Sequence, residues 1–225
     1  MLRVGLTGGL GSGKSTAAQI LAAHGAYVLS ADAIGRELMQ RGQQVYAAIV
    51  AHFGPSVVAP DGSLDRAALA RIAFGTLAEG SGRVEELNAI VHPATIARQL
   101  QLIQEIATRN PKAVVIVESA LIFETKHGET KHGGNGLRDR FDKIILVTAP
   151  DDMKIARFIA RTSGSNTITG EARAALEAEA RRRLAQQLPD EQKGAQCDYI
   201  LVNDGSLDDL ARQVDALWPA LVAAA

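Results

Sequence analysis

The chain has 225 residues, of which 47% are hydrophobic and 22% charged, as in globular proteins with a sizeable core. Its formal net charge of −1 argues against general attraction to nucleic acid or to an anionic membrane. The sequence holds no apolar stretch of membrane-spanning length and no secretory signal pattern, and its one cysteine, Cys197, excludes an internal disulfide framework and a cysteine-based zinc site. We therefore expect a cytoplasmic protein without nucleic-acid or membrane partners.

The first predicted strand, Leu2–Thr7, leads directly into a glycine-rich loop and a helix-like pattern. The loop sequence GGLGSGKST fits the pattern G-x-x-x-x-G-K-[ST], in which backbone N–H groups and a helix N-terminus face bound phosphates. Lys14 would reach the β- and γ-phosphates, and the Ser15 hydroxyl would hold Mg²⁺. A turn that merely begins a helix is the weaker alternative. The expected ATP contacts of the loop are Gly9, Gly11, Ser12, Gly13, Lys14, Ser15 and Thr16.

Four further strand candidates, short and rich in Val and Ile, are separated by helical patterns. Strands that alternate with helices predict a parallel sheet, here five-stranded, with helices on both faces in an α/β fold of three layers. Ligands of such sheets bind beyond the carboxyl ends of the strands, and Asp32, Glu118 and Asn203 all follow such ends. The candidates are Tyr27–Ser30, Ala113–Ser119, Lys143–Thr148 and Tyr199–Val202.

The second and third strands are separated by about eighty residues, far more than a crossover requires. We interpret about residues 31–91 as an inserted helical subdomain that binds a second substrate. Pro93 is expected at the first position of a further helix, where proline is favoured. The helical patterns within the insertion are Ala33–Arg41, Gln44–Phe53, Asp65–Phe74 and Arg83–Val91.

Asp32 lies two residues past the second strand. Its carboxylate could orient or deprotonate an acceptor hydroxyl, or it could cap a helix that begins at Ala33. The spacing alone leaves both interpretations open. Arg36, one helical turn later, should share the helix face of Asp32.

Residues 154–184 carry seven Lys and Arg residues against three Glu residues, and their centre is a polar loop with two glycines. Two basic helical arms around such a loop predict a lid, about residues 154–194, that closes over phosphates. The alternative is a solvated helix held by pairs such as Arg173–Glu177 and Glu179–Arg183. Arg157 and Arg161 are the favoured lid cations because a guanidinium grips phosphate oxygens in a fixed geometry. The histidine-bearing loop at 125–136 is interpreted as an exposed insertion without a function.

A phosphate loop is compatible with a small-molecule kinase, a GTPase-type switch or a motor-like ATPase. The sequence has no Asn-Lys-x-Asp signal of a switch, and the candidate strand for a motor ends in Glu118 instead of Asp. A kinase needs an acceptor site, a group that orients the acceptor hydroxyl and a cationic lid, and each has a candidate here.

The whole set of motifs resembles the dephospho-coenzyme A kinase family. The matching stretches occur in the family's order and span nearly the whole chain: the phosphate loop, Asp32 with Arg36, Phe53-Gly54, Asp61–Arg66, His92-Pro93, Ala120–Glu124, Gln187–Pro189 and Asn203–Gly205. The resemblance implies transfer of the ATP γ-phosphate to the ribose 3′-hydroxyl of dephospho-coenzyme A, the last step of coenzyme A synthesis, in the cytoplasm.

The resemblance also implies the roles of particular residues. Asp32 matches the catalytic carboxylate, which acts with Lys14, Arg157 and Arg161, and Asn203 and Gly205 match the segment near the adenine of ATP. His92 could contact substrate or only cap or pack a helix, and Arg66 could contact a coenzyme phosphate or lie on the surface. The implied acceptor contacts are Asp32, Arg36, Arg66, His92, Leu121 and Glu124.

The chain departs from the family's pattern at two motif positions, and its loop at 125–140 and the tip of its lid at 162–170 are longer than usual in the family. Ser30-Ala31-Asp32 replaces Asp-x-Asp, which leaves Asp32 as the sole carboxylate there, and Ala120 replaces a proline. The expected architecture is a P-loop core of about residues 1–30, 92–153 and 195–225, with the helical subdomain and the lid, in a protein that we expect to be a monomer. The alternatives are another small-metabolite or nucleoside monophosphate kinase and a nucleotide-binding regulatory module.

Overall fold

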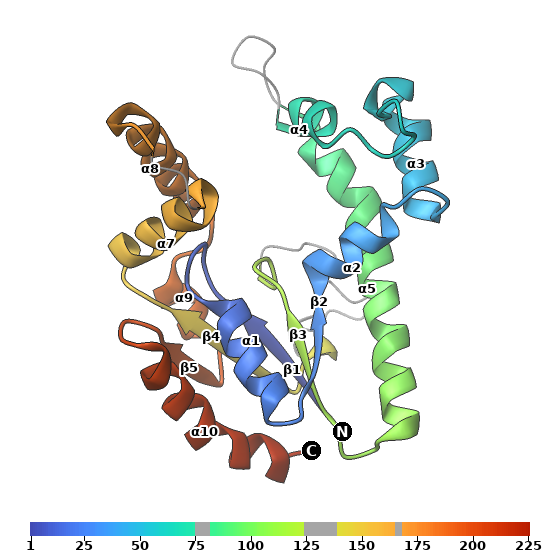
Figure 1. The fold of residues 1–225 in the computed structure, drawn as a ribbon. Coiled ribbons are helices and arrows are strands. Elements are labelled where there is room, and N and C mark those ends of the chain that lie inside the picture. The colour runs from blue at the N-terminus through green and yellow to red at the C-terminus, as the bar shows by residue number, and fades with distance from the viewer. Residues whose placement is uncertain (75–81, 124–138, 165–167) are drawn as a thin grey trace. The chain divides into compact units, whose positions relative to one another are not determined.

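A computed structural model of the chain describes residues 1–74, 82–123, 139–164 and 168–225 (Figure 1). The chain divides into two compact units, Met1–Leu29 with Ile106–Ala225 and Ser30–Glu105. The strands are β1 Leu2–Thr7, β2 Tyr27–Ser30, β3 Val114–Glu118, β4 Lys143–Thr148 and β5 Tyr199–Val202. The helices are α1 Lys14–Ala23, α2 Ala31–Leu38, α3 Gln44–Phe53, the 3₁₀ turn η1 Pro55–Val57, α4 Arg66–Phe74, α5 Val84–Arg109, α7 Asp151–Ser163, α8 Gly170–Ala185, α9 Asp190–Gly194 and α10 Leu207–Ala223.

The five strands form one parallel sheet in the order β2-β3-β1-β4-β5, which confirms the predicted α/β fold. Four strands have the predicted bounds, and β3 is one residue shorter at each end than expected. The register pairs Leu6 of β1 with Glu118 of β3, so the residues that follow these strands lie at the same edge of the sheet. The central strand β1 therefore delivers the glycine-rich loop to the edge where parallel sheets bind ligands.

One face of the sheet is covered by α1 and α10, which contact each other (Figure 1). Alternate residues of β1, Leu2, Val4 and Leu6, are almost fully buried in the cluster that these helices form with the sheet. The intervening Gly5 faces the opposite side, where a Cβ would meet Ile122 and Phe141. Burial on both faces is the reason why these strands read as nearly continuous apolar runs.

The edge strand β5 is partly shielded by a side chain of α10. The Gln213 carboxamide accepts a hydrogen bond from Val202 N at 2.8 Å and donates one to Val202 O at 2.8 Å. These two bonds imitate the pattern of a neighbouring strand and satisfy main-chain groups that an edge would leave open.

The unit Ser30–Glu105 has its own apolar cluster, in which Val45, Ile49 and Phe53 of α3 pack with Leu69 of α4. Helix α5 contributes Leu87, Ile90, Val91 and Ala94 to the partly buried edge of this cluster. Outside it, Glu86 accepts hydrogen bonds from Arg83 and His52, and these bonds lower the pKa of Glu86 to about 2.

The prediction that Pro93 begins a separate helix was wrong, because α5 continues through Pro93 from Val84 to Arg109. A proline inside a helix removes one backbone donor and strains the preceding turn. Thr95 Oγ1 donates a hydrogen bond to Val91 O at 2.9 Å just beside that turn. Apolar contacts of α5 on both sides of the proline hold the helix together despite the missing donor.

Helices α7 and α8 pack on each other through Ile155, Phe158, Ile159 and Ala180. Along α8, Glu179 pairs with Arg183 as expected for a solvated helix, whereas Glu177 pairs with Arg181. Within the described residues, no helix is both long and apolar enough to cross a membrane.

Candidate active site

The glycine-rich loop joins β1 to the N-terminus of α1, and two of its glycines are required by close contacts. Gly11 has φ 69°, and a Cβ there would lie 2.2 Å from the Lys154 carbonyl oxygen. Gly13 is the N-cap of α1 with φ 96°, and a Cβ there would lie 2.1 Å from Asn203 Nδ2. Any larger residue would therefore displace the backbone that surrounds the start of α1, and a helix N-terminus is where backbone N–H groups bind phosphate.

Lys14 and Ser12 place polar groups in the loop itself. Lys14 Nζ donates to Gly8 O at 2.8 Å and to Gly9 O at 3.1 Å, so its ammonium lies against the loop. Ser12 Oγ is fully buried and has no hydrogen-bond partner among the described residues. A buried hydroxyl without a hydrogen-bond partner costs stability. We therefore expect a phosphate ligand to supply the missing partner.

Ser15 and Glu118 form a hydroxyl–carboxylate pair at the edge of the sheet. Ser15 Oγ donates to Glu118 Oε1 at 2.7 Å. A hydroxyl and a carboxylate are oxygen ligands of the kind that Mg²⁺ takes beside nucleotide phosphates, so these residues fit the cofactor predicted for Ser15. No cluster of three or more His, Cys, Asp or Glu suited to a metal occurs in the described parts of the chain. The sequence analysis noted Glu118 at a strand end, where such sheets bind ligands, but assigned it no role in the site.

Asn203 follows β5 and connects it to the loop. Its Nδ2 donates to Ser12 O at 2.9 Å, while its backbone oxygen accepts from Arg157 Nη1 at 3.0 Å. The structure thus brings Asn203 and Arg157 together at the loop. Arg161, one turn further along α7, is exposed, and a Cβ at Gly205 would meet Asp209 of α10 and not the loop.

The outer side of the loop rests on residues to which the sequence analysis assigned no contact with the loop. Leu10 N donates to Gln187 Oε1 at 3.2 Å, and the Leu10 side chain packs against the cluster of α7 and α8. Below this contact the buried Lys154 donates to Asp190 Oδ2 at 2.6 Å, and Thr148 Oγ1 donates to the same oxygen at 2.5 Å. Burial alone would lower the pKa of Lys154, but the hydrogen bonds to Asp190 and Asp151 outweigh it and raise that pKa. The Lys154 ammonium is therefore charged, and its hydrogen bonds stabilise the structure behind the phosphate loop.

Asp32 and Arg36 lie on α2, in the other unit. The interpretation of Asp32 as a helix cap was wrong, because α2 begins at Ala31 and its N-cap is Ser30, whose Oγ accepts from Ala33 N at 3.4 Å. The Asp32 side chain is exposed in the first turn, and Arg36 Nε donates to the Asp32 carbonyl oxygen at 3.1 Å. Ser30 therefore has a structural role as the N-cap, and the Asp32 carboxylate is not used for capping.

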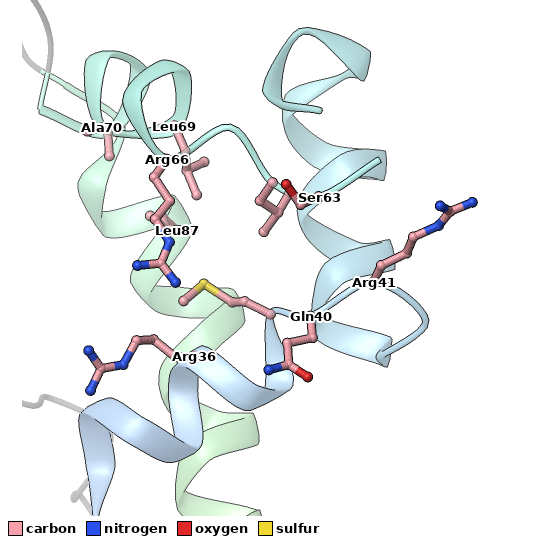
Figure 2. A pocket seen from close by; sticks show the side chains of 11 residues that line it. Arg36, Gln40, Arg41, Ser63, Arg66, Leu69, Ala70 and Leu87 are labelled. Carbon is pink, nitrogen blue, oxygen red and sulfur yellow. The ribbon is translucent and has the colours of Figure 1, made fainter. Parts of the chain in front are cut away.

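The remaining acceptor candidates come from separate segments of the chain. Arg66 begins α4 and lines a cavity together with Arg36 (Figure 2). His92 lies inside α5, so the alternative that it caps a helix was wrong. Leu121, which follows β3, is 38% exposed, and Glu124 lies outside the described residues.

A glycine loop of this kind, at the carboxyl end of the central strand of a sheet ordered β2-β3-β1-β4-β5, defines a P-loop kinase. The model of the dephospho-CoA kinase family matches residues 2–209. The chain therefore belongs to the dephospho-CoA kinase family, as its motifs predicted.

Individual relatives agree with this membership along the full chain. The dephospho-CoA kinase of Thermobifida fusca is 37% identical over 221 residues, which cover 98% of this chain and 96% of that protein. The dephospho-CoA kinase of Streptomyces avermitilis is 37% identical over 222 residues, covering 99% of this chain and 95% of that protein. Among solved structures, that of TT1252 from Thermus thermophilus matches with a TM-score of 0.71 and 31% identity, over 98% of this chain and 97% of that one.

Proposed function

We propose that this chain transfers the γ-phosphate of ATP to the ribose 3′-hydroxyl of dephospho-coenzyme A, yielding coenzyme A and ADP in the last step of coenzyme A synthesis. The observation that carries the proposal is the match of the dephospho-CoA kinase family to residues 2–209. The architecture that we propose has a P-loop core, an acceptor-binding subdomain of about residues 31–91 and a lid of about residues 154–194, in a monomeric cytoplasmic enzyme.

The donor is bound by the phosphate loop. We assign the triphosphate to the N–H groups between Gly9 and Thr16, and Lys14 to the β- and γ-phosphates, where its ammonium stabilises the charge that spreads over the transferred group. Ser15 and Glu118 are the residues that would hold Mg²⁺, directly or through water. When bound, this ion neutralises charge on the β- and γ-phosphates. Asn203 supports the loop through Ser12, which keeps the N–H groups oriented toward the donor.

The acceptor is activated by Asp32. Its carboxylate accepts a hydrogen bond from the 3′-hydroxyl and takes the proton as the hydroxyl oxygen bonds to the γ-phosphorus. The bond from that phosphorus to the β,γ-bridging oxygen breaks at the same time, and ADP leaves with the electron pair. With Ser30 in the preceding acidic position of the family, Asp32 performs this step alone. Arg36 and Arg66 supply guanidinium groups for acceptor phosphates, and His92, Leu121 and Glu124 complete the proposed contacts.

The arms α7 and α8 act as the lid. Arg157, held at 3.0 Å from the Asn203 carbonyl oxygen, is preorganised beside the loop, whereas the exposed Arg161 side chain is free to close on phosphate. Closure removes water that would otherwise compete with the acceptor hydroxyl for the phosphoryl group.

The proposal is tested by measuring ADP release from ATP with and without dephospho-coenzyme A, and by identifying the product through its 3′-phosphate. We expect release that depends on this acceptor. Release that instead depends on a nucleoside monophosphate would identify another P-loop kinase, and ATP binding without any acceptor-dependent turnover would identify a regulatory module. Either result would overturn the proposal.

A further inference from the structure

The motif Gln187–Pro189 follows the end of α8 and contacts the phosphate loop within the same compact unit. Helix α8 ends at Ala185 with Gln186 as its C-cap. The Gln187 carboxamide oxygen accepts a hydrogen bond from Leu10 N at 3.2 Å. Gln187 is half-buried, whereas Gln186 is exposed. The motif therefore links an arm of the proposed lid to the tip of the loop that is assigned to the donor.

Gly9, the residue before Leu10, also faces Gln187. A Cβ at Gly9 would lie 3.3 Å from Gln187 Oε1, which is tighter than an ordinary van der Waals contact. The next atoms in range are Asp190 Oδ1 at 3.6 Å and Leu184 Cδ2 at 3.7 Å. Gly9 does not have a positive φ, so its small size, and not its backbone conformation, lets the main chain approach the carboxamide.

The segment that carries Gln187 has a fixed base. Pro189 is the N-cap of the short helix α9, and Asp190 is its first residue. Asp190 Oδ2 accepts hydrogen bonds from Lys154 of α7 and from Thr148, the last residue of β4. These bonds tie the segment to the sheet and to α7. A side chain on such a base holds its partner more precisely than one on an unsupported loop.

Other contacts of the loop tip restrict its position without orienting its peptide groups. The Leu10 side chain packs against the apolar cluster of α7 and α8. At Gly11 the main chain lies against the Lys154 carbonyl oxygen, which a Cβ would approach to 2.2 Å. Apolar packing is not directional, whereas a hydrogen bond is. The bond from Leu10 N to Gln187 therefore fixes the direction of the peptide group between Gly9 and Leu10.

This peptide group connects Gln187 to Lys14. The Gly9 carbonyl and the Leu10 N–H lie in one plane, so a bond that fixes the direction of the N–H also fixes that of the carbonyl. Gly9 O accepts a hydrogen bond from Ser12 N at 3.2 Å and another from Lys14 Nζ at 3.1 Å. An ammonium has three donors, so Lys14 can keep its loop carbonyls while it binds phosphate. Gln187 and the Lys14 ammonium are therefore joined through a single peptide unit.

We propose that Gln187 is a positioning residue for phosphoryl transfer, which orients the peptide group between Gly9 and Leu10 and thereby the ammonium of Lys14. The inference rests on the proposed function, in which Lys14 binds the β- and γ-phosphates. Without the carboxamide, this peptide group rotates more freely and the ammonium loses its fixed acceptor. The charge still attracts the triphosphate, but it is no longer held where charge develops in the transition state. Gln187 therefore affects kcat more than the affinity for ATP.

The first experiment compares Gln187→Met with Gln186→Met. Methionine keeps the length of the side chain and removes the carboxamide, and the exposed Gln186 provides the same change beside the site. Because a small misplacement of a catalytic group is costly, we expect kcat to fall about tenfold in Gln187→Met. The Kd for ATP, from calorimetric titration, and the KM for dephospho-coenzyme A should stay within about twofold of wild type. Gln186→Met should match wild type in all three constants.

Two kinetic outcomes would overturn the inference. Equal kcat values in the two variants would mean that the Gln187 carboxamide positions no group that takes part in the reaction. A higher Kd for ATP with an unchanged kcat would instead make Gln187 a contributor to ground-state binding.

The second experiment uses the wild-type protein and no acceptor, so it depends neither on the folding of a variant nor on the proposed function. Amide hydrogen exchange, followed by NMR with and without ADP, should be slow at Leu10 because its N–H is bonded to Gln187. Exchange at Leu10 as fast as in an unstructured peptide would overturn the inference. A wild-type protein that does not phosphorylate dephospho-coenzyme A would instead overturn the proposed function, and exchange at Leu10 would still report whether its N–H is held.

Discussion

Asn203 offers a sharp test of how the phosphate loop is supported, because two substitutions there separate hydrogen bonding from shape. The Asn203 side chain is 9% exposed, and its Nδ2 donates to Ser12 O at 2.9 Å. Asn203→Ala removes this donor and leaves a small space. Asn203→Asp keeps the shape and the acceptor that faces Arg157, but it replaces the N–H donor to the Ser12 carbonyl with a carboxylate oxygen that repels it.

The expected magnitudes follow from these contacts. Loss of one hydrogen bond costs about 1 kcal/mol, and a group left buried without a partner adds about 1–3 kcal/mol, more if it is charged. The loop relaxes to avoid these costs, and ATP must restore its geometry on binding. At about 1.4 kcal/mol per factor of ten, we expect the Kd for ATP to rise about fivefold in Asn203→Ala and about a hundredfold in Asn203→Asp.

The Kd is measured by calorimetric titration with ATP, and circular dichroism verifies that each variant is folded. Asn110→Asp, the same change at a position outside the site, is the matched control and should bind ATP as wild type does. The reasoning would be refuted if Asn203→Asp bound ATP as well as Asn203→Ala does, since the isosteric change would then carry no penalty.

Three further outcomes are expected. Asp32→Asn should lower kcat at least about a hundredfold while the Kd for ATP stays near normal, and a loss of only a few fold in steady-state kinetics would contradict the role of Asp32 as base. Lys154→Met removes the charged hydrogen-bond donor to Asp190, which costs about 2 kcal/mol of stability and should lower the Tm measured by calorimetry by about 4–8 °C. Lys112→Met, at an exposed position, is the control, and an equal Tm shift there would refute a stabilising role of the buried Lys154 ammonium. Because Glu86 has a pKa of about 2 against its usual 4.5, it stabilises the fold above pH 4.5, and this contribution is lost as pH falls toward 2. The free energy of unfolding, measured by denaturant titration, should therefore fall less between pH 4.5 and pH 2 in Glu86→Gln than in wild type. Identical pH profiles of the two proteins would exclude this contribution of Glu86.

The sheet was predictable because its determinants are local. Residues of β1 and β4 are buried on both faces, so each strand reads as an apolar run with clear ends. The phosphate loop is equally local, since its glycines, Lys14 and Ser15 lie within eight residues of one another. Local patterns of this kind require no knowledge of which distant segments pack against them.

The predictions that failed concern features that depend on packing contacts and on the exact start of a helix. Pro93 looks like a helix start because proline favours that position, but apolar contacts of Val91 and Ala94 carry α5 through it. Asp32 was a possible cap of a helix that begins at Ala33, but Ser30, another favoured cap residue, takes that role because the helix begins two residues earlier than predicted.

The partners of the loop were missed for a related reason. Glu118 reaches Ser15 across 103 residues, and Gln187 reaches Leu10 across 177 residues. Contacts at such separations are set by strand order and helix packing, which periodicity does not specify. The place of Glu118 at a strand end was predicted, but its contact with Ser15 follows only when β3 is placed beside β1. Nothing in the local sequence of Gln187 indicates its contact with the loop.

The Gln213 carboxamide has a consequence for the behaviour of the protein in concentrated solution. By occupying both main-chain groups of Val202, it denies an incoming chain the first rung of an intermolecular ladder on β5. This protection matters because the Ile200 and Val202 side chains of that strand are exposed and apolar. Gln213 thus protects this edge of the sheet against aggregation, which the hydrophobic residues of β5 alone would not do.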